Sequence, residues 1–420
     1  MAMDAIETPF GIEPMTVGDE IPRSLADACM SLRDGVADLG ARLPAATKRT
    51  LADLVRITNC YYSNLIEGHA TKPRDIRAAL AGDGDRLPSP RRDLALEAAA
   101  HVRVQREVDR LHSVGGLERP TTVRFVRWLH REFYRDVPPA LRRVVREDGT
   151  VVEVAPGEFR SREDEDVTVG RHHPPSSSRV EAFMGHFEDR MRFSEVGGTT
   201  TVTSVATAHH RFAYVHPFVD GNGRVARLMS HAMVVRAGLG AEGLWSVSRG
   251  LARGLREKGE YHRMMAHADS PRQGDRDGRG NLSERAMLEF TEWFVHVMAD
   301  QVRFMRAAFD FEGLGERLER VTHDLTDDPR AVRLVRAVHD HGTLRRGGAP
   351  IVLEGVSSRT ARTVMSDLVR RGLLASDTPR GDLRIGVPLD HKDRMFPGLL
   401  GDGPITAPEP EVPAFMRRDT

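Results

Sequence analysis

The chain has 420 residues, and its 61 Lys and Arg are balanced by 61 Asp and Glu, so its formal net charge is zero. At roughly 150 residues per domain this length predicts two or three domains, and the balanced charge argues against bulk electrostatic binding to nucleic acid or acidic membranes. The two cysteines, Cys29 and Cys60, are too few for a disulfide framework. No segment reaches the ~18 apolar residues of a membrane helix, and no signal peptide is recognisable, so we expect a cytoplasmic protein without membrane contact.

The pattern of apolar residues predicts a mainly α-helical fold. The first strong helix, over residues 50–67, repeats apolar side chains at three- and four-residue steps, and Gly68 stands where a C-terminal cap belongs. Seven further segments lack internal proline and carry helix-forming residues at regular spacing. They are residues 92–112, 121–134, 179–193, 201–215, 224–237, 249–267 and 283–309.

Two loops interrupt the predicted helices. Residues 153–178 contain several prolines and the β-like run from Val167 to Val169, so we expect a loop with a hairpin. Residues 270–284 are polar and rich in glycine. Because their acidic residues miss the spacing of a calcium-binding loop, we interpret this segment as an ordinary loop.

A separate unit is predicted over residues 325–395. Two helical stripes are followed there by LLASDT and DLRIGVP, which are typical of two strands joined by a turn at Pro379 to Gly381. Helices followed by a β-hairpin indicate a winged helix, in which Arg359 and Arg362 could contact DNA phosphates. Since arginines on a helix usually form a solvated face, a module for packing or protein contact is an equally open interpretation.

The stretch HPFVDGNGRVAR, from His216 to Arg227, joins two of the predicted helices and therefore forms a loop that leads into a helix N-terminus. The unpaired backbone N–H groups and the positive end of the helix dipole attract an anion there. Gly221 and Gly223 let a ligand approach the backbone closely, and Asn222 adds a side-chain donor. The loop is thus predicted to bind an anion.

The charged residues of the same stretch indicate phosphate chemistry. Arg224 and Arg227 supply guanidinium groups that match phosphate oxygens. Asp220 offers a hard oxygen ligand for a Mg²⁺ ion that shares the phosphates. His216 carries an imidazole, whose ordinary pKa near neutrality suits it to take a proton from a hydroxyl nucleophile. Together these residues predict phosphoryl or nucleotidyl transfer.

This stretch resembles the core signature of the Fic family, HPFx[DE]GNGRxxR, at every specified position. The matching residues are His216, Pro217, Phe218, Asp220, Gly221, Asn222, Gly223, Arg224 and Arg227. The resemblance extends over roughly the first three quarters of the chain, and the loop GEFR…VTVGRHHPP looks like the family's β-hairpin flap.

The resemblance implies transfer of AMP from ATP to a Ser, Thr or Tyr hydroxyl of a protein target. It makes His216 the base, puts Asp220 on Mg²⁺ and puts Arg227 on the outer phosphates. The implied catalytic residues are His216, Asn222 and Arg224. The implied nucleotide-binding residues are Gly221, Asn222, Gly223, Arg224, Arg227 and Tyr261. Members of the family also use other nucleotides or remove AMP, so the donor and the direction stay open.

The end of the predicted helix 50–67, SNLIEG, resembles the inhibitory motif [ST]xxxE[GN] of Fic proteins that carry their inhibitor before the core. The motif residues are Ser63, Glu67 and Gly68. The resemblance implies that Glu67 pairs with Arg227 and occupies the space of the terminal phosphate. Because Ser63 and Glu67 are four residues apart on one helical face, the hydroxyl is expected to orient the carboxylate.

Two residues near the signature have competing interpretations. His209 and His216 are two helical turns apart and could be two ligands of a transition metal. His209 falls on the apolar stripe of the helix 201–215, which favours a buried core histidine with its polar atoms bonded. Tyr261 is a candidate wall of the nucleotide pocket, although a tyrosine in a helix is more often part of a core.

These observations divide the chain into four parts. Residues 1–115 form an N-terminal helical region with the inhibitory helix, residues 116–310 form the catalytic core, residues 325–395 form the winged helix and residues 396–420 form a proline-rich tail. Two alternatives to an autoinhibited AMP transferase remain: an enzyme that removes AMP, and a DNA-binding regulator whose core senses nucleotide. A homodimer is also left open.

Overall fold

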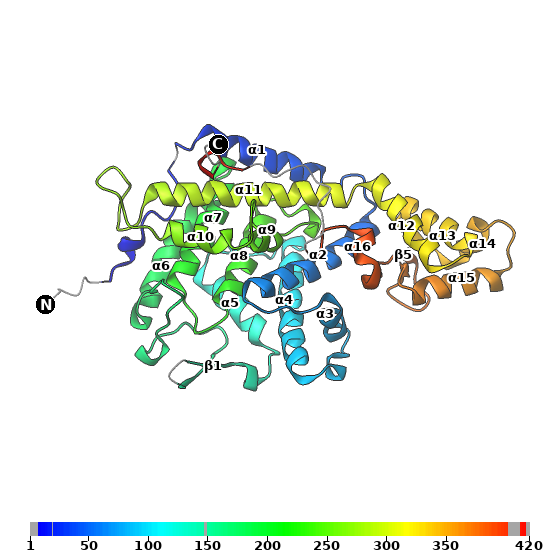
Figure 1. Ribbon diagram of the computed structural model, residues 1–420, viewed down its shortest axis with the longest axis horizontal. Helices are drawn as coiled ribbons and strands as arrows, with labels where there is room; N and C mark the ends of the chain where they lie inside the picture. Colours follow the sequence, from blue (N-terminus) through cyan, green and yellow to red (C-terminus); the bar gives the residue numbers. More distant parts are fainter. Residues whose placement is uncertain (1–6, 19, 147–148, 402–411, 417–420) are drawn as a thin grey trace.

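The computed structural model describes residues 7–18, 20–146, 149–401 and 412–416, and helices dominate these residues (Figure 1). The N-terminal region contains α1 (Arg23–Asp38), α2 (Ala45–Ile66), α3 (Pro73–Leu80) and α4 (Ser89–Ser113). The central region contains α5 (Val123–Tyr134), α6 (Val180–Arg190), α7 (Gly198–Val215), α8 (Asn222–Arg236), α9 (Ser248–Arg253), α10 (Glu260–Ala268) and α11 (Glu284–Ala308). A short antiparallel hairpin, β1 (Arg143–Val145) with β2 (Val151–Glu153), precedes α6. The expected mainly helical fold is confirmed.

The hairpin of α7 and α8 lies at the centre of the molecule. The side chains of α8 are buried on nearly every side of the helix, because α7, α4 and α5 pack around it. A helix that is surrounded in this way has little freedom to move. Figure 1 shows α11 crossing over α7 and α8, with α1 running beside it. The loop between α7 and α8 therefore stands on a rigid base.

The inhibitory helix predicted over residues 50–67 is α2, which begins earlier than predicted. It ends in a Schellman motif, in which Gly68 N donates to Leu65 O (3.1 Å) and His69 N donates to Asn64 O (2.8 Å). Gly68 has a φ of 85°, which only glycine adopts without strain. The predicted cap at Gly68 is confirmed, and it fixes the direction in which the last residues of α2 point.

Two sequence predictions about elements need correction, and three helices were not predicted. The helix predicted over 249–267 is broken into α9 and α10 at Gly254 (φ 70°), where the buried Glu260 carboxylate accepts from the backbone N–H groups of Leu255 and Arg256. No strand forms at residues 167–169; Val169 makes only an isolated bridge with His172. The helices α1, α3 and α12 (Phe311–Leu325) were not predicted.

The C-terminal unit follows α12. It contains α13 (Pro329–His341), α14 (Ala349–Val352), α15 (Ser358–Arg370), α16 (Lys392–Met395), β3 (Thr343–Leu344), β4 (Leu374–Ala375) and β5 (Leu383–Ile385). The three strands form an antiparallel sheet in the order β3-β5-β4. The predicted pair of strands after α15 is present, and assignment of the unit to the winged-helix class stays a prediction.

The segment that follows α16 is not a free tail. Phe396, Leu399 and Leu400 are buried in the same continuous core as the N-terminal helices. The first residues of the proline-rich tail predicted over 396–420 are therefore packed against the core, and residues 402–411 and 417–420 lie outside the described part of the chain. Among the described helices, none has the combination of length and apolar character that a bilayer span requires.

Candidate active site

The loop between α7 and α8 has a fixed backbone. His216 ends α7 in the left-handed conformation (φ 49°, ψ 59°), and its N–H donates to Phe212 O. Gly221 begins α8 with a φ of 81°, and a Cβ at this position would meet the Tyr134 ring at 3.0 Å. Glycine is therefore required at Gly221 both by its conformation and by the close ring.

Asn222 shapes this loop from within. Its side chain accepts from Phe218 N (2.9 Å) and donates to Phe218 O (2.8 Å), and it is almost fully buried. The sequence predicted a side-chain donor for the ligand, but here the amide closes the loop on itself. The predicted anion donors that remain are the backbone N–H groups at the start of α8.

His216 is half-buried beside this helix start. Burial lowers the pKa of its imidazole to about 4, and the nearby charge of Arg160 and of His172 acts in the same direction. At neutral pH the ring is therefore uncharged. An uncharged imidazole can accept a proton, as a general base must.

Asp220, in the loop just before α8, faces Arg224 on the first turn of that helix. Asp220 Oδ2 accepts from Arg224 Nη2 (2.9 Å) and from the Tyr134 hydroxyl (2.6 Å), while its side chain stays 43% exposed. Arg224 also pairs with Glu97 of α4 and lies over the Phe133 ring. The carboxylate of Asp220 is thus oriented and still open to solvent.

The residues present fit a magnesium ion that keeps most of its water ligands, and they do not fit one held by several side chains. No group of three or more His, Cys, Asp or Glu side chains suited to a metal occurs in the described ranges. A Mg²⁺ that keeps most of its waters and shares phosphate oxygens needs only one or two carboxylates, and the exposed Asp220 offers one.

The metal pair of His209 and His216 is not formed, because His209 bonds Ser230 Oγ (2.9 Å) and the Tyr261 hydroxyl (2.8 Å). His209 is the core histidine that the sequence favoured.

The predicted contact between α2 and α8 is present. Glu67 Oε1 lies 2.5 Å from Arg227 Nη2, although the two residues are 160 positions apart. A Cβ at Gly223 would collide with this carboxylate, so Glu67 reaches the first turn of α8. Burial raises the pKa of Glu67, but the charge and hydrogen bond of Arg227 outweigh burial, and the net pKa is lowered. A carboxylate therefore lies where the sequence predicts an anion.

Ser63 has a different role from the predicted one. Its hydroxyl accepts from Arg227 Nε (2.8 Å), and its backbone carbonyl accepts from Arg227 Nη2 (3.2 Å). The serine thus orients the arginine, whereas the sequence predicted that it would orient Glu67. Tyr261 is buried with its hydroxyl on His209, and its place in a nucleotide pocket stays a prediction.

Sequence reasoning missed four residues that surround the loop. Glu97 pairs with Arg224, and the Tyr134 hydroxyl bonds the Asp220 carboxylate. The third residue is His130, whose Nε2 donates to Asp220 O (3.2 Å). The fourth, Arg160, bonds the backbone on both sides of His216. They lie on other elements and outside the signature, so no local motif marked them. Arg160 lies in the stretch GEFR, which resembles part of the family's flap, but the resemblance implies no role for this arginine.

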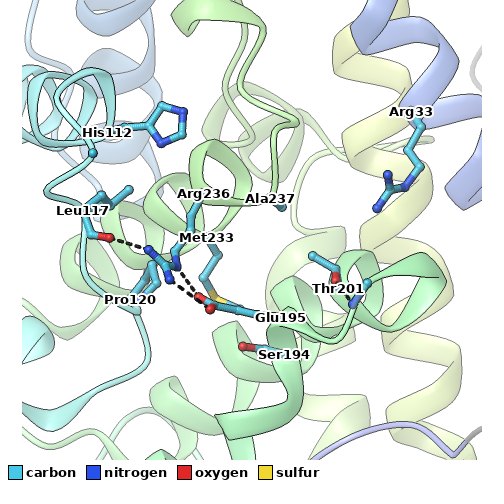
Figure 2. A pocket seen from close by; sticks show the side chains of 12 residues that line it. Arg33, His112, Leu117, Pro120, Ser194, Glu195, Thr201, Met233, Arg236 and Ala237 are labelled. Atoms are coloured by element: carbon cyan, nitrogen blue, oxygen red, sulfur yellow. Dashed lines mark hydrogen bonds and ion pairs between the residues drawn. The ribbon is translucent and has the colours of Figure 1, made fainter.

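A cavity of about 540 Å³ lies at the opposite end of α8 (Figure 2). Arg33, Glu195 and Arg236 are among the residues that line it. Figure 2 shows Arg236 directed towards Glu195 and the Leu117 carbonyl, which already use its donors. This cavity is separate from the signature loop and adds no residue to the candidate site.

Known proteins are similar to this chain in sequence and fold. Residues 120–234 match the model of the Fic/DOC family. The proteins named "Protein adenylyltransferase Fic" from Drosophila willistoni and Aedes aegypti are 36% identical over 104 residues, which are 25% of this chain. The match spans only 20% of the length of each of these relatives.

A solved structure shows the same overall fold. The crystal structure of a Fic family protein from Desulfovibrio desulfuricans G20 matches with a TM-score of 0.50 and 18% identity, over 87% of this chain and 97% of that chain. At this identity the likeness concerns the fold alone. Residues 120–234 are therefore similar to the Fic/DOC family in sequence, and the overall fold agrees with that similarity.

Proposed function

We propose that the protein is a Mg²⁺-dependent protein adenylyltransferase that Glu67 holds inactive in the nucleotide-free state. The observation that carries the proposal is the Glu67 carboxylate at the first turn of α8, bonded to Arg227. A carboxylate and a phosphate present similar anionic oxygens to a guanidinium. Glu67 therefore stands in for the terminal phosphate of ATP and competes with it for Arg227.

The reaction follows from the residues around the loop. A hydroxyl oxygen of the target protein forms a bond to the α-phosphorus of ATP, and the bond from that phosphorus to the bridging oxygen breaks. The hydroxyl proton passes to the uncharged His216 imidazole, and pyrophosphate leaves. The N–H groups of α8 stabilise the charge on the α-phosphate oxygens. Asp220 would hold Mg²⁺, which would neutralise charge on the phosphates.

The decisive experiment compares wild-type protein with Glu67→Gly during incubation with labelled ATP and Mg²⁺. Label on protein should increase in Glu67→Gly, because Arg227 is released for the phosphate. Glu242→Gly is a matched control: Glu242 also pairs with a residue of α2, Lys48 at its other end (2.6 Å), and its φ of 54° suits glycine. Equal activity of wild type, Glu67→Gly and Glu242→Gly would refute the autoinhibition.

The reverse reaction is the second candidate. Glu67 keeps its charge, because its pKa is lowered, and its side chain is 34% exposed. An ionised carboxylate beside the anion site could orient a water molecule towards the phosphorus of an AMP group on a protein. Incubation with a protein that already carries labelled AMP separates the two directions. Release of label that requires Glu67 would favour removal of AMP.

A further inference from the structure

Arg160 is an almost fully buried arginine, 1% exposed, in the loop that precedes α6. It holds three consecutive carbonyls at the end of α7. Its Nε donates to His216 O (2.8 Å), its Nη2 donates to Val215 O (3.1 Å), and its backbone N–H donates to Pro217 O (2.9 Å). Two of these bonds come from the guanidinium and one from the backbone of the same residue.

The same guanidinium also holds the flap region. Its Nη1 donates to Ser177 Oγ (3.0 Å), and its Nη2 donates to Pro175 O (2.5 Å). Asp166 lies 3.5 Å away and is half-exposed, so it neutralises the arginine only loosely. Burying a charged group in this way is unfavourable unless its donors are used. Here they bond three backbone carbonyls and the Ser177 hydroxyl, which belong to two separate segments.

The bonds fall where the backbone needs support. His216 has positive φ, a conformation that costs free energy for a residue with a Cβ and persists only where neighbours enforce it. We propose that Arg160 is a positioning residue: it locks the backbone of His216 in this conformation and ties the base to the flap loop. The inference rests on the proposed role of His216 as the base.

The charge of Arg160 has a second effect on His216. After burial, it is the strongest cause of the lowered pKa of the imidazole. Of the other charged groups near the ring, His172 acts in the same direction and Glu67 opposes it. Arg160 therefore also helps to keep the ring uncharged at neutral pH.

The test uses the full chain with Glu67→Gly as the parent. Arg160→Lys keeps the charge but cannot span both segments, and Arg160→Gln also removes the charge. Both variants should lower kcat on the order of 10²-fold with an unchanged KM for ATP, because the nucleotide contacts lie on α8. Arg162→Gln is the matched control: Arg162 lies in the same loop, is mostly exposed and pairs with Asp164. It should leave kcat unchanged.

NMR titration of the His216 ring separates positioning from general stability. The pKa of His216 should rise in Arg160→Gln and stay at the parent value in Arg160→Lys, and the acid limb of the pH–rate profile should move with it. Unchanged kcat in both Arg160 variants, or equal losses in kcat and ATP affinity, would overturn the inference. So would equal His216 pKa values in the parent and Arg160→Gln. The titration does not depend on activity. It therefore tests the role of Arg160 even where Glu67→Gly shows no transfer and the proposed function fails.

Discussion

Arg227 has two uses that exclude one another. In this structure it bonds Ser63 and Glu67, and in the proposed reaction it binds a phosphate. Removing one partner of a buried ion pair usually destabilises a protein by several kcal/mol. After removal of Glu67, however, the arginine regains a partner when ATP binds. Removal of Glu67 and removal of Arg227 should therefore change the activity in different ways.

This inequality predicts the behaviour of three variants. Glu67→Gly should raise transfer, whereas Arg227→Ala should lower it on the order of 10²-fold or more, because a charged donor to the phosphates is lost. The double variant should behave like Arg227→Ala. Transfer rates with labelled ATP measure all three. A double variant as active as Glu67→Gly would show that Arg227 has no role towards the phosphate.

His216 gives the prediction on pH. His216→Ala should lower transfer on the order of 10²-fold or more with little change in ATP affinity, since the phosphate contacts lie elsewhere. Because the pKa of His216 is lowered to about 4, the ring is already in its basic form across pH 6 to 8. The rate should therefore be lost only as pH falls towards 4. An acid limb near pH 6.5, measured by initial rates in the Glu67→Gly protein, would contradict the buried, uncharged imidazole.

At the scale of elements, α2 ends at an acidic residue, Glu67. The negative end of a helix dipole disfavours an acid there, so Arg227 has to compensate. Further back on the same face, Asn59 donates to Gln105 of α4 (2.8 Å), and Arg56 pairs with Asp109 (2.8 Å). This face of α2 is polar because it packs beside the site, and it brings Glu67 to α8 in a defined register.

The helix α15 carries the prediction on DNA. Arg359, Arg362, Arg330 and Arg370 line a groove of about 820 Å³. Arg330 is paired with Asp328, and Arg370 is paired with Asp367. No ion pair joins Arg359 or Arg362 to another residue in the described part of the chain, so these two charges are available to a partner.

If these arginines meet DNA phosphates, the full chain should bind duplex DNA with an affinity that falls steeply with salt. Alanine at both Arg359 and Arg362 should flatten the slope of log affinity against log salt by about one to two units. Alanine at Arg110, an exposed arginine of α4, is the control. Absence of binding at low salt would favour a contact with protein instead.

Local patterns predicted α7, α8 and the cap at Gly68, because helical periodicity and a positive-φ glycine are properties of neighbouring residues. They failed where a side-chain bond breaks a helix or where packing against a distant element decides. The break between α9 and α10 depends on the Glu260 carboxylate, which satisfies the N–H groups that a continuous helix would have bonded internally. The amphipathic α1 lies against α11, far from it in sequence.

The candidate site divides in the same way. The signature supplied the loop, and the inhibitory motif supplied the Glu67–Arg227 contact across 160 positions. The side chains that hold the loop from outside, including Arg160 and Tyr134, come from segments that only the fold brings together. Their residue types are common, so nothing in the sequence around them distinguishes them from surface arginines or core tyrosines.

At the scale of the whole molecule, the C-terminal unit contacts α2, the helix that ends at Glu67. Thr50 of α2 donates to Ile385 O of β5 (3.1 Å) and accepts from Arg384 Nη1 (2.8 Å). Nearer the end of α2, the Tyr62 hydroxyl meets the backbone N–H of Gly401 (3.2 Å). The helix α2 is thus held at Thr50 by strand β5 and at Tyr62 by Gly401, which follows the C-terminal unit.

This arrangement predicts that loosening the C-terminal unit raises transfer while Glu67 is intact. Thr50→Val removes the hydroxyl that joins α2 to β5, and a hydrogen bond worth about 1 kcal/mol corresponds to roughly a fivefold change in the population of a released helix. Thr58→Val is the matched control, because Thr58 is a buried threonine of the same helix that bonds only its own backbone, at Leu54 O. Transfer of labelled AMP should rise in Thr50→Val and not in Thr58→Val.

In the Glu67→Gly background Thr50→Val should add nothing, since the helix then carries no inhibitor to release. If both threonine variants raise transfer equally, the gain comes from general loosening of α2, and the C-terminal unit has no specific hold on the inhibitory helix.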